Sequence, residues 1–596
     1  MRRPLRLRIA MLATGCVLLA ATVSSQAERR LPPVFGARDA ARASEFDTRI
    51  RTYLTPTRVV WVSDATGAQV VNPQRLLTTG TTTGQAELVN RDLASLRSDA
   101  NNRGAILLDF GREIHGGVRL VTGMWESKRP VRARIRFGES VSEAMSDAGG
   151  ESGATNDHAI RDDSHLLPWL GTIEIGSTGF RFVRIDMAEP DAELLLREVS
   201  AAFVYRDVEY LGSFHSSDER LNRIWLTGAY TVHLNMQNYL WDGIKRDRLV
   251  WVGDLHPEVM TISSAFGHHD IVPRSLDLIR DATPLPEFMN GISSYSMWWV
   301  VIHREWYRLY GNLDYLRAQQ NYLRGLLHLL ISKTRNGREQ IDGWRFLDWS
   351  TEGNEQAVDA GLQALMVIAL ESGAELSEAL GDEKTADDAR KVVAQARRHA
   401  APKTDNKQAT ALLSLAGLVS ARKANETLSQ GGVRGYSTFY GYYILQAKAK
   451  AGDYVGAMNA IREYWGGMLD LGATSFWEDF DVAWLENAGR IDELPVEGKR
   501  DVHATYGEHS YKKLRMSLAH GWATGPTSWL TEHVLGVQVV EPGSKTLRIR
   551  PNLGDLSFVE GTFPTPLGLV KLRHTRQPDG SVKTDIEAPP GVRLIY

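Results

Sequence analysis

The sequence contains almost no cysteine: Cys16 is the only one in 596 residues. It lies in an apolar N-terminal segment that we expect to be removed, which leaves the mature chain without a thiol. Disulfide bonds and thiol catalysis are therefore excluded for the mature protein. An exported protein without cysteine is typical of a bacterial periplasm, so we expect a secreted or periplasmic protein.

Clustered positive charge is also missing. The chain has 69 Lys and Arg against 72 Asp and Glu, a formal net charge of −3, and no long basic run. A nucleic-acid partner would require a concentrated positive face, so this class of partner is excluded. Hydrophobic residues make up 43% and charged residues 24%, as in folded globular proteins. The length predicts two to four domains.

Residues 1–27 have the layout of a secretory signal peptide. An apolar run extends from Ile9 to Val23, and Ser25-Gln26-Ala27 offers small residues for cleavage after Ala27. The run is short for a membrane span and polar sequence follows at once, so no membrane contact beyond export is expected. The segment that ends at Cys16 loosely resembles a lipoprotein processing site, which leaves lipid anchoring as a minor alternative. The basic start of the segment consists of Arg2, Arg3, Arg6 and Arg8.

Three zones of different periodicity follow. Residues 28–210 hold short alternating runs between Gly, Asp and Asn turns, which predict an antiparallel β-sandwich. Residues 211–535 repeat apolar positions at steps of three and four, which predict helices. Residues 536–596 return to strand signals, with a hairpin turn at Asp579-Gly580, and predict a second, small β-sandwich. The clearest strand signals of the first and last zones lie at 105–110, 131–137, 180–185 and 546–551.

The helical zone is predicted to begin at a capping box formed by Ser216 and Glu219. A long run of helical hairpins can build either a solenoid or a closed α/α barrel. No fixed sequence period is visible, which weighs against a simple solenoid. Amphipathic segments lie at 312–333, 356–380, 384–400, 407–428, 437–451 and 453–465.

The first loop of chemical interest spans residues 241–254. It interleaves three carboxylates, three cations, two tryptophans and two glycines. A solvated salt-bridged loop would account for the charges, but not for the large aromatics and glycines among them. We therefore expect this loop to carry function.

Two later loops add an acid and a histidine. Residues 472–480 embed Glu478 and Asp479 between aromatic side chains, and apolar surroundings raise the pKa of a carboxyl. Residues 517–525 place His520 and Trp522 beside a glycine-rich bend, although a lone histidine is more often structural. Two carboxyls from separate loops suit glycoside hydrolysis, which needs one protonated and one ionised group.

The residues by themselves determine neither the stereochemistry of the reaction nor a metal site. Spacing along the chain does not reveal the spatial separation of two carboxyls, so retention and inversion both remain open. Two groups of potential metal ligands match no zinc spacing, and we expect neither a metal nor a cofactor. These groups are Asp254, His256 and Glu258, and His268, His269 and Asp270.

The loops resemble those of the α-L-rhamnosidases of glycoside hydrolase family 78. The family signature reads approximately Asp-Cys-Pro-x-Arg-Glu-x-Leu-Gly-Trp-x-Gly-Asp. A Trp-Glu pair in a Gly-Ala-Thr-rich loop is matched by residues 472–478, and a Ser-x-x-His segment by residues 517–520. The likeness covers roughly residues 100 to 570. Signature positions matched without a gap are Asp242, Arg246, Leu249, Trp251, Gly253 and Asp254.

The resemblance implies a multidomain α and β fold in which an (α/α)6 toroid is flanked by N-terminal and C-terminal antiparallel β-sandwich domains. It implies an exo-acting, inverting hydrolase that releases terminal α-L-rhamnose, with a carbohydrate substrate and no cofactor. Glu478 falls on the general base. The residues that the resemblance places around the sugar are Asp242, Arg246, Trp251, Asp254, Trp477, His520 and Trp522.

One departure from the family pattern concerns the general acid. The family has Glu where this chain has Asp247, and the Cys-Pro before it is replaced by Gly243-Ile244. The shorter side chain must stay protonated near neutrality although arginines flank it. We expect Asp247 to be the general acid. In two alternatives Asp247 is structural and Asp242, Asp254 or Glu258 protonates the leaving group, or the site is weak or inactive.

Two other functions remain open. The chain could be another six-hairpin glycosidase, or a polysaccharide lyase acting on uronic acids. A lyase would need a tyrosine or histidine base, for which Tyr436, Tyr440, His509 and His520 are available. The chain could also be a glycan-binding protein that has lost catalysis. Lys245 and Arg246 would tolerate an acidic leaving group. The sequence does not determine the oligomeric state.

Overall fold

The computed structural model describes residues 47–596 except 65–68, 79–83 and 89–90. The predicted signal peptide, with Cys16, lies outside the described residues. Residues Arg49–Tyr596 form one structural unit, to which all of the following applies.

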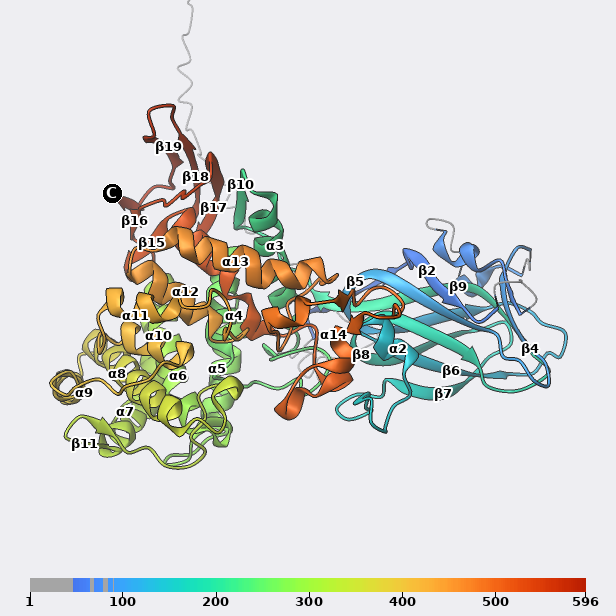
Figure 1. Ribbon diagram of the computed structural model, residues 1–596, viewed down its shortest axis with the longest axis horizontal. Coiled ribbons are helices and arrows are strands. Elements are labelled where there is room, and N and C mark those ends of the chain that lie inside the picture. Colours follow the sequence, from blue (N-terminus) through green and yellow to red (C-terminus); the bar gives the residue numbers. More distant parts are fainter. Residues whose placement is uncertain (1–46, 65–68, 79–83, 89–90) are drawn as a thin grey trace, which may run out of the picture. The chain divides into compact units, whose positions relative to one another are not determined.

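The N-terminal part of this unit is a nine-stranded antiparallel sheet (Figure 1). Its path is β3-β4-β9-β5-β8-β6-β7, with β1 paired to β9 and β2 paired to β5. The predicted strands at 105–110, 131–137 and 180–185 are confirmed as parts of β5, β6 and β8. A short helix, α2 (Val141–Met145), follows β6. The strands are β1 (Arg49–Leu54), β2 (Arg58–Val62), β3 (Val70–Val71), β4 (Ala94–Ser98), β5 (Ala105–Thr122), β6 (Val131–Gly138), β7 (Asp162–Leu167), β8 (Thr172–Met187) and β9 (Ala192–Arg206).

The long strand β5 bends because its pairing with β8 is interrupted at two bulges. One bulge contains Gly116, whose φ of 147° and close approach to Ala202 leave no room for a side chain. Beyond the bend β5 pairs with β9 as well as β8. One continuous hydrogen-bonded sheet therefore encloses the apolar core that the alternating pattern predicted.

The central part is helical. Helices α4, α6, α8, α10, α12 and α15 contact one another in this order, and α15 packs back on α4. This closed order of contacts agrees with the ring of hairpins that the resemblance implies. The helices are α3 (Glu219–Asn235), α4 (Leu255–Ala265), α5 (Ile271–Asp281), α6 (Ser293–Tyr310), α7 (Leu313–Ser332), α8 (Glu355–Ala379), α9 (Glu383–Ala396), α10 (Lys407–Leu415), α11 (Ala421–Leu428), α12 (Gly441–Lys450), α13 (Tyr454–Asp470), α14 (Val502–Thr505) and α15 (Gly525–Trp529).

Two expectations about the helices are wrong in detail. The N-cap of α3 is Asp218, whose carboxylate accepts from the amides of Arg220 and Leu221. Ser216 cannot cap this helix because it lies in strand β10 (Ser213–Ser216), paired with the C-terminal part of the chain. The segment 407–428 is not one helix but two, α10 and α11.

The ring of helices surrounds a cavity of about 410 Å³. Residues of all six ring helices line it, mostly from their later turns, and strand β15 (Val537–Glu541) lines it as well. None of the predicted site residues lies there. Helix α8 is long and apolar enough to cross a membrane, but 78% of its most apolar stretch is buried inside the protein, as expected for a core helix.

The C-terminal part consists of two small sheets, β10-β17-β18-β19 and β15-β16-β20. Strand β10 joins the first sheet from more than 300 residues earlier in the chain, pairing Ser213 with Thr562. The predicted hairpin turn at Asp579-Gly580 is confirmed between β18 and β19. One pair, β16 with β20, is parallel rather than antiparallel. The remaining strands are β16 (Thr546–Ile549), β17 (Phe558–Thr565), β18 (Gly568–Arg576), β19 (Val582–Glu587) and β20 (Arg593–Ile595).

Candidate active site

The predicted site residues gather at the N-terminal ends of the ring helices. The loop that holds Asp242 to Asp254 leads into α4, and the loop that holds His520 and Trp522 leads into α15. Glu478 follows α13 on a segment that runs beside residues 517–520, with hydrogen bonds from Glu478 N to Ser517 O and from His520 N to Phe476 O. The opposite ends of the helices face the cavity described above.

Arg246 holds the two carboxylates that the sequence singled out. Its Nη1 donates to Asp247 Oδ1 at 3.0 Å, and its Nη2 donates to Glu478 Oε1. Both acceptor oxygens are thus hydrogen-bonded to one guanidinium, which limits the distance between them to about 8 Å. Arg246 itself is buried, and its charged head also lies 5.6 Å from the ring centre of Tyr511. The burial of this guanidinium is possible because two carboxyl groups accept its hydrogen bonds.

Asp247 is the more accessible of the two acids. Its side chain is 20% exposed, against 4% for Glu478. Asp247 and Arg248 both adopt left-handed backbone conformations, with φ of 52° and 57°. Such conformations are costly for residues with a side chain and concentrate at functional sites. They turn the Asp247 carboxylate toward Arg246 and toward His158, whose Nε2 lies 3.4 Å away.

Glu478 is surrounded by donors. Besides Arg246, the backbone N–H of Ser517 donates to its Oε2 at 3.0 Å. Burial raises the pKa of Glu478 above its ordinary value, while Arg246 and the Ser517 amide act in the opposite direction. Its carbonyl oxygen accepts from Thr438 Oγ1 at 2.6 Å and from Trp522 Nε1 at 3.0 Å. The residue is therefore fixed at both its main chain and its side chain.

His520 lies between two carboxylates. Its Nε2 is 3.7 Å from both Asp242 Oδ2 and Glu478 Oε1. Burial, reinforced by Arg246, holds the pKa of His520 well below its ordinary value, so the ring is neutral at neutral pH. A neutral imidazole can exchange one proton with a bound hydroxyl group without adding a charge to the site.

Three further acids lie deeper. Asp242 accepts from the Leu249 amide at 2.9 Å, and Asp254 accepts from Tyr295 Oη at 2.6 Å. Burial raises the pKa of both well above the ordinary value, and neighbouring carboxylates raise it further. Glu258 is completely buried, and neither of its carboxylate oxygens has a hydrogen-bond partner among the described residues. Glu258 therefore has no surface from which to reach a leaving group.

The predicted tryptophans differ in position. Trp522 stacks on Phe439 with ring centres 5.0 Å apart, and its indole binds the Glu478 carbonyl. Trp251 is half-buried and packs edge-on against Tyr295. Trp477 is completely buried against Phe480, so it offers no surface to a sugar. Trp477 and Trp522 both belong to the buried core of the helical part, and Trp477 is the more deeply buried of the two.

Sequence reasoning missed three residues beside the site, Tyr295, Tyr511 and Asp348. Tyr295 binds Asp254, and Tyr511 faces Arg246. Asp348 accepts from Ser350 and Ser437, and burial raises its pKa. Burial also raises the pKa of Asp479 to about 7, with Asp348 and Glu478 adding to the effect. Asp348 follows Trp344 and Phe346 and precedes Trp349, the same acid-among-aromatics signal that identified Glu478.

Lys245 lies on the opposite side of the loop from Arg246. It is 1% exposed, and its Nζ donates to the carbonyls of Leu514 and Met516 at 2.6 and 2.7 Å. It is therefore unavailable to an acidic leaving group, which corrects that expectation. Tyr440, one of the possible lyase bases, is also completely buried, and burial raises its pKa well above the ordinary value.

Comparison with protein families gives two matches. The family model of the bacterial alpha-L-rhamnosidase 6 hairpin glycosidase domain matches residues 209–534. That of the bacterial alpha-L-rhamnosidase C-terminal domain matches residues 536–595. The first match alone spans more than half of the 596 residues. No curated protein matches the chain.

Several solved structures share the fold. A rhamnosidase of glycoside hydrolase family 78 from Bacillus sp. GL1 superposes with a TM-score of 0.70 at 21% identity, covering 88% of this chain and 55% of that one. A rhamnosidase from Klebsiella oxytoca with rhamnose bound gives 0.63 at 19%, covering 83% and 97%. An α-L-rhamnosidase from Aspergillus terreus gives 0.64 at 18%, covering 84% and 60%. The chain thus spans little more than half the length of the Bacillus protein.

Proposed function

The chain belongs to the family of bacterial α-L-rhamnosidases with a six-hairpin glycosidase domain, and on that premise we propose that it is an exo-acting glycoside hydrolase that releases terminal α-L-rhamnose with inversion. Its substrate is a glycan or glycoside, and no cofactor takes part in the reaction. The predicted signal segment 1–27 supports export to the periplasm or the medium as part of the same proposal.

One observation carries the proposal: Asp247 and Glu478 occupy opposite nitrogens of Arg246. In an inverting hydrolase one carboxylate activates the attacking water and the other carboxyl protonates the leaving oxygen. Inverting enzymes hold these groups about 6.5–9.5 Å apart to admit a water, and retaining enzymes about 5–5.5 Å. The hydrogen bonds to Arg246 set only an upper limit of about 8 Å on their separation, which allows either spacing, so inversion is proposed from the family resemblance.

Glu478 acts as the general base in this proposal. Arg246 and the Ser517 amide stabilise its ionised form, while burial keeps its pKa above that of a free glutamate. An ionised carboxylate with this balance can take a proton from water during attack on the sugar. The neutral ring of His520, 3.7 Å away, leaves the carboxylate free of a second cation.

Asp247 acts as the general acid. It is the most accessible acid of the group, and its backbone adopts a left-handed conformation. Asp242 and Asp254 are almost completely buried and already accept hydrogen bonds, which suits them to bind sugar hydroxyls rather than to donate to a leaving group.

Hydrolysis of aryl glycosides tests the proposal. We expect cleavage of an aryl α-L-rhamnoside and no cleavage of the matching glucoside or galactoside, with β-L-rhamnose as the first product in proton NMR. Release of the α-anomer first would keep the substrate but reject inversion. An unsaturated product that absorbs in the ultraviolet would identify a lyase instead.

Two substitutions test the roles. Glu478→Gln should reduce turnover by at least about 1,000-fold while rhamnose still binds, since only the base is lost. Asp247→Asn should impair substrates with poor leaving groups much more than activated aryl glycosides. If rhamnose binds the wild-type protein but no substrate is turned over, the protein is a glycan-binding relative without catalysis.

A further inference from the structure

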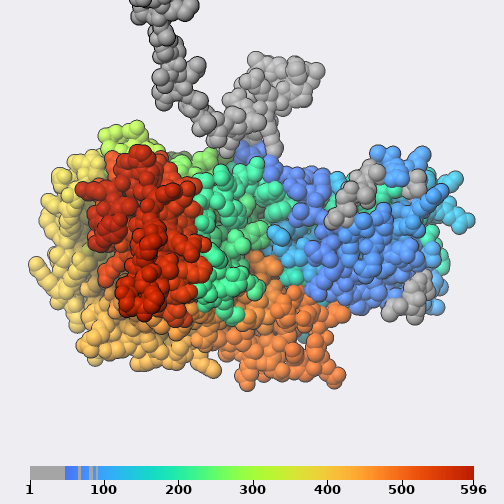
Figure 2. Space-filling view, turned by 90° about the horizontal axis from the view of Figure 1, so that it is seen from above, coloured from blue at the N-terminus to red at the C-terminus, as the bar shows by residue number. Residues whose placement is uncertain are grey.

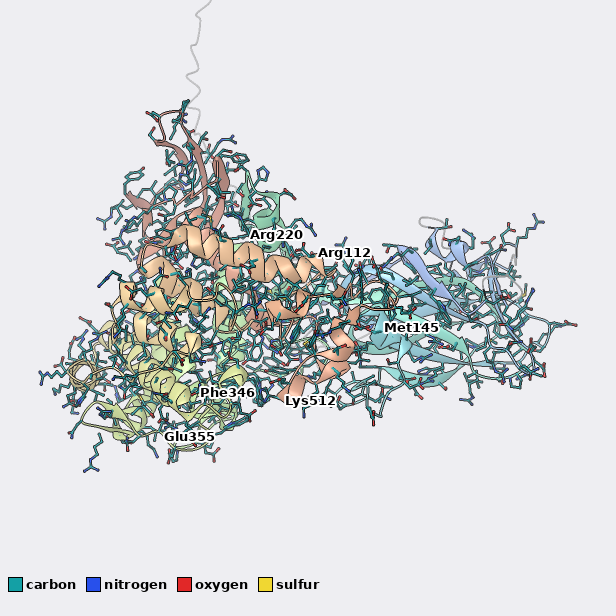
Figure 3. All side chains as sticks on the ribbon, in the orientation of Figure 1. Arg112, Met145, Arg220, Phe346, Glu355 and Lys512 are labelled. Carbon is teal, nitrogen blue, oxygen red and sulfur yellow. The ribbon has the colours of Figure 1, made fainter. Side chains whose placement is uncertain are left out.

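A buried cluster of charged residues joins the N-terminal β-domain to the loops of the active site. In Figure 2 the surface of residues near 470–515 adjoins that of the β-domain, and Arg181 Nη1 donates to Gly472 O at 3.0 Å across this boundary. Figure 3 labels Met145 at the end of α2 and Lys512 in the segment that leads to the site. The cluster consists of Glu139, Glu143 and Arg161 from the β-domain, and Lys245 and His503 from the helical part.

The charges of this cluster compensate one another. Lys245 Nζ lies 2.8 Å from Glu143 Oε1 and 3.5 Å from Glu139 Oε2, and Arg161 lies 2.7 Å from Glu143. Glu139, Glu143 and His503 also offer ligand atoms within 4.8 Å of one another, as a metal site would. Lys245 and Arg161 bring two positive charges to Glu139 and Glu143, so these two carboxylates are compensated without a metal.

Glu139 differs from Glu143 in what it holds. Its carboxylate accepts from the Leu518 amide at 2.6 Å and from Ser517 Oγ at 3.3 Å. Glu143 instead accepts from the Glu139 amide at 2.9 Å, within the β-domain. Glu139 alone of the two therefore reaches the segment 517–518.

That segment is the one that orients Glu478. The Ser517 amide donates to Glu478 Oε2 at 3.0 Å, and the Ser517 carbonyl accepts from the Glu478 amide at 2.9 Å. Residues 514 and 516 are fixed from the same side by Lys245 Nζ. A displacement of the segment would therefore move a hydrogen-bond donor of the carboxylate.

We propose that Glu139, a residue of the N-terminal β-domain, is a positioning residue that holds the 517–518 backbone so that the Ser517 amide orients the Glu478 carboxylate. The inference rests on the proposed function of Glu478, but its structural part stands without it. The β-domain then contributes to the reaction through one side chain, in addition to stabilising the fold.

Hydrogen–deuterium exchange tests the structural part. Glu139→Asp keeps the charge but withdraws the carboxylate from Leu518 by about one C–C bond. We expect at least about tenfold faster exchange in peptides covering 514–522. Glu198→Asp is the control, because Glu198 is a buried glutamate that pairs with Arg119 and Ser200 inside the β-domain, and it should leave these peptides unchanged. Unchanged exchange in Glu139→Asp overturns the proposal, whatever the activity of the protein.

Kinetics test the functional part. We expect Glu139→Asp to lower kcat on an aryl α-L-rhamnoside about 10–100-fold with KM within about twofold, and Glu198→Asp to keep both. Because the Ser517 amide lowers the pKa of Glu478, its displacement raises that pKa and moves the acidic limb of kcat/KM to higher pH. The charged and titratable groups that face Glu478 in both variants are Arg246, Asp247, Asp254, Asp479, Tyr511 and His520.

The outcomes separate the two proposals. Wild-type protein without hydrolytic activity rejects the proposed function, and the exchange data still decide whether Glu139 holds the segment. Active wild-type protein with equal losses in the Glu139 and Glu198 variants overturns the positioning role. If Glu139→Asp does not fold, Glu139→Gln replaces it: its neutral carbonyl is a weaker acceptor for the Leu518 amide, so the same peptides should exchange faster by a smaller factor.

Discussion

Asp247 and Glu478 are bound to the two ends of one guanidinium, that of Arg246. Arg246 and Asp247 are neighbours in the loop before α4, whereas Glu478 lies 232 residues after Arg246, in the segment that follows α13. Arg246 therefore sets both the separation and the charge balance of the proposed acid and base.

Replacement of Arg246 should lower kcat/KM even when the positive charge is kept. A lysine cannot hold two carboxylates with a planar fork, so Arg246→Lys should lower kcat/KM about 100-fold and shift the acidic limb of its pH profile upward. Arg220→Lys is the matched control. Arg220 lies at the N-terminal end of α3, and two of its nitrogens donate to the carboxylate of Asp470. Equal effects of the two substitutions would exclude a special role for Arg246.

Tyr295→Phe removes one hydrogen bond from a buried acid. Tyr295 Oη donates to Asp254 at 2.6 Å and lowers the pKa of that carboxyl, so its loss raises the pKa further. If Asp254 binds a sugar hydroxyl, KM should rise about tenfold with a smaller change in kcat. Tyr315→Phe, which deletes the same atom near Asp277, should leave KM unchanged. An unaltered KM in Tyr295→Phe would remove Asp254 from the binding site.

Two tryptophan substitutions should separate catalysis from stability. Trp522→Phe loses the indole bond to the Glu478 carbonyl and should lower kcat about tenfold. Trp477→Phe reduces a completely buried side chain and should cost about 2 kcal/mol of unfolding free energy, with kcat and KM within about twofold. Steady-state kinetics and urea unfolding on both variants check this. A large rise in KM for Trp477→Phe would show that its ring reaches the substrate after all.

Buried histidines should make the protein sensitive to acid. Burial lowers the pKa of His303 from 6.5 to about 4, so the unfolded chain binds a proton between these values that the folded chain does not. Stability therefore falls as pH drops below about 6.5, and this residue accounts for up to about 3 kcal/mol by pH 4.

The substitution His303→Gln isolates that contribution. Urea unfolding at pH 7.5 and pH 4.5 should show that the variant loses about 2–3 kcal/mol less than wild-type protein on acidification. His215→Gln, at a side chain that is 58% exposed, should lose as much as wild type. A pH dependence identical in all three proteins would contradict the assignment of this effect to His303.

The order of the β, helical and β zones was predictable because the periodicity of strands and helices depends on residues only two to four positions apart in the chain. The strands around 105, 131 and 180 and most of the helices follow from this local periodicity. The loops that hold Asp242, Glu478 and His520 were predictable for a different reason: acids, aromatics and glycines are rarely mixed so densely without a role.

Long-range packing decided the rest. Ser216 was predicted to cap a helix, but its strand β10 pairs with β17. Trp477 was predicted to line the pocket, but its side chain is completely buried. The direction of a side chain is set by which distant surface packs against it, and no local pattern encodes that choice.

The sequence by itself thus determined the class of fold, the reactive loops and the resemblance to a hydrolase family. Only the tertiary structure decided that one guanidinium joins Asp247 to Glu478, and that Glu139 reaches the segment beside the proposed base. These contacts join residues hundreds of positions apart. Their geometry follows from the closure of the helical ring against the β-domain, which depends on the packing of the whole chain.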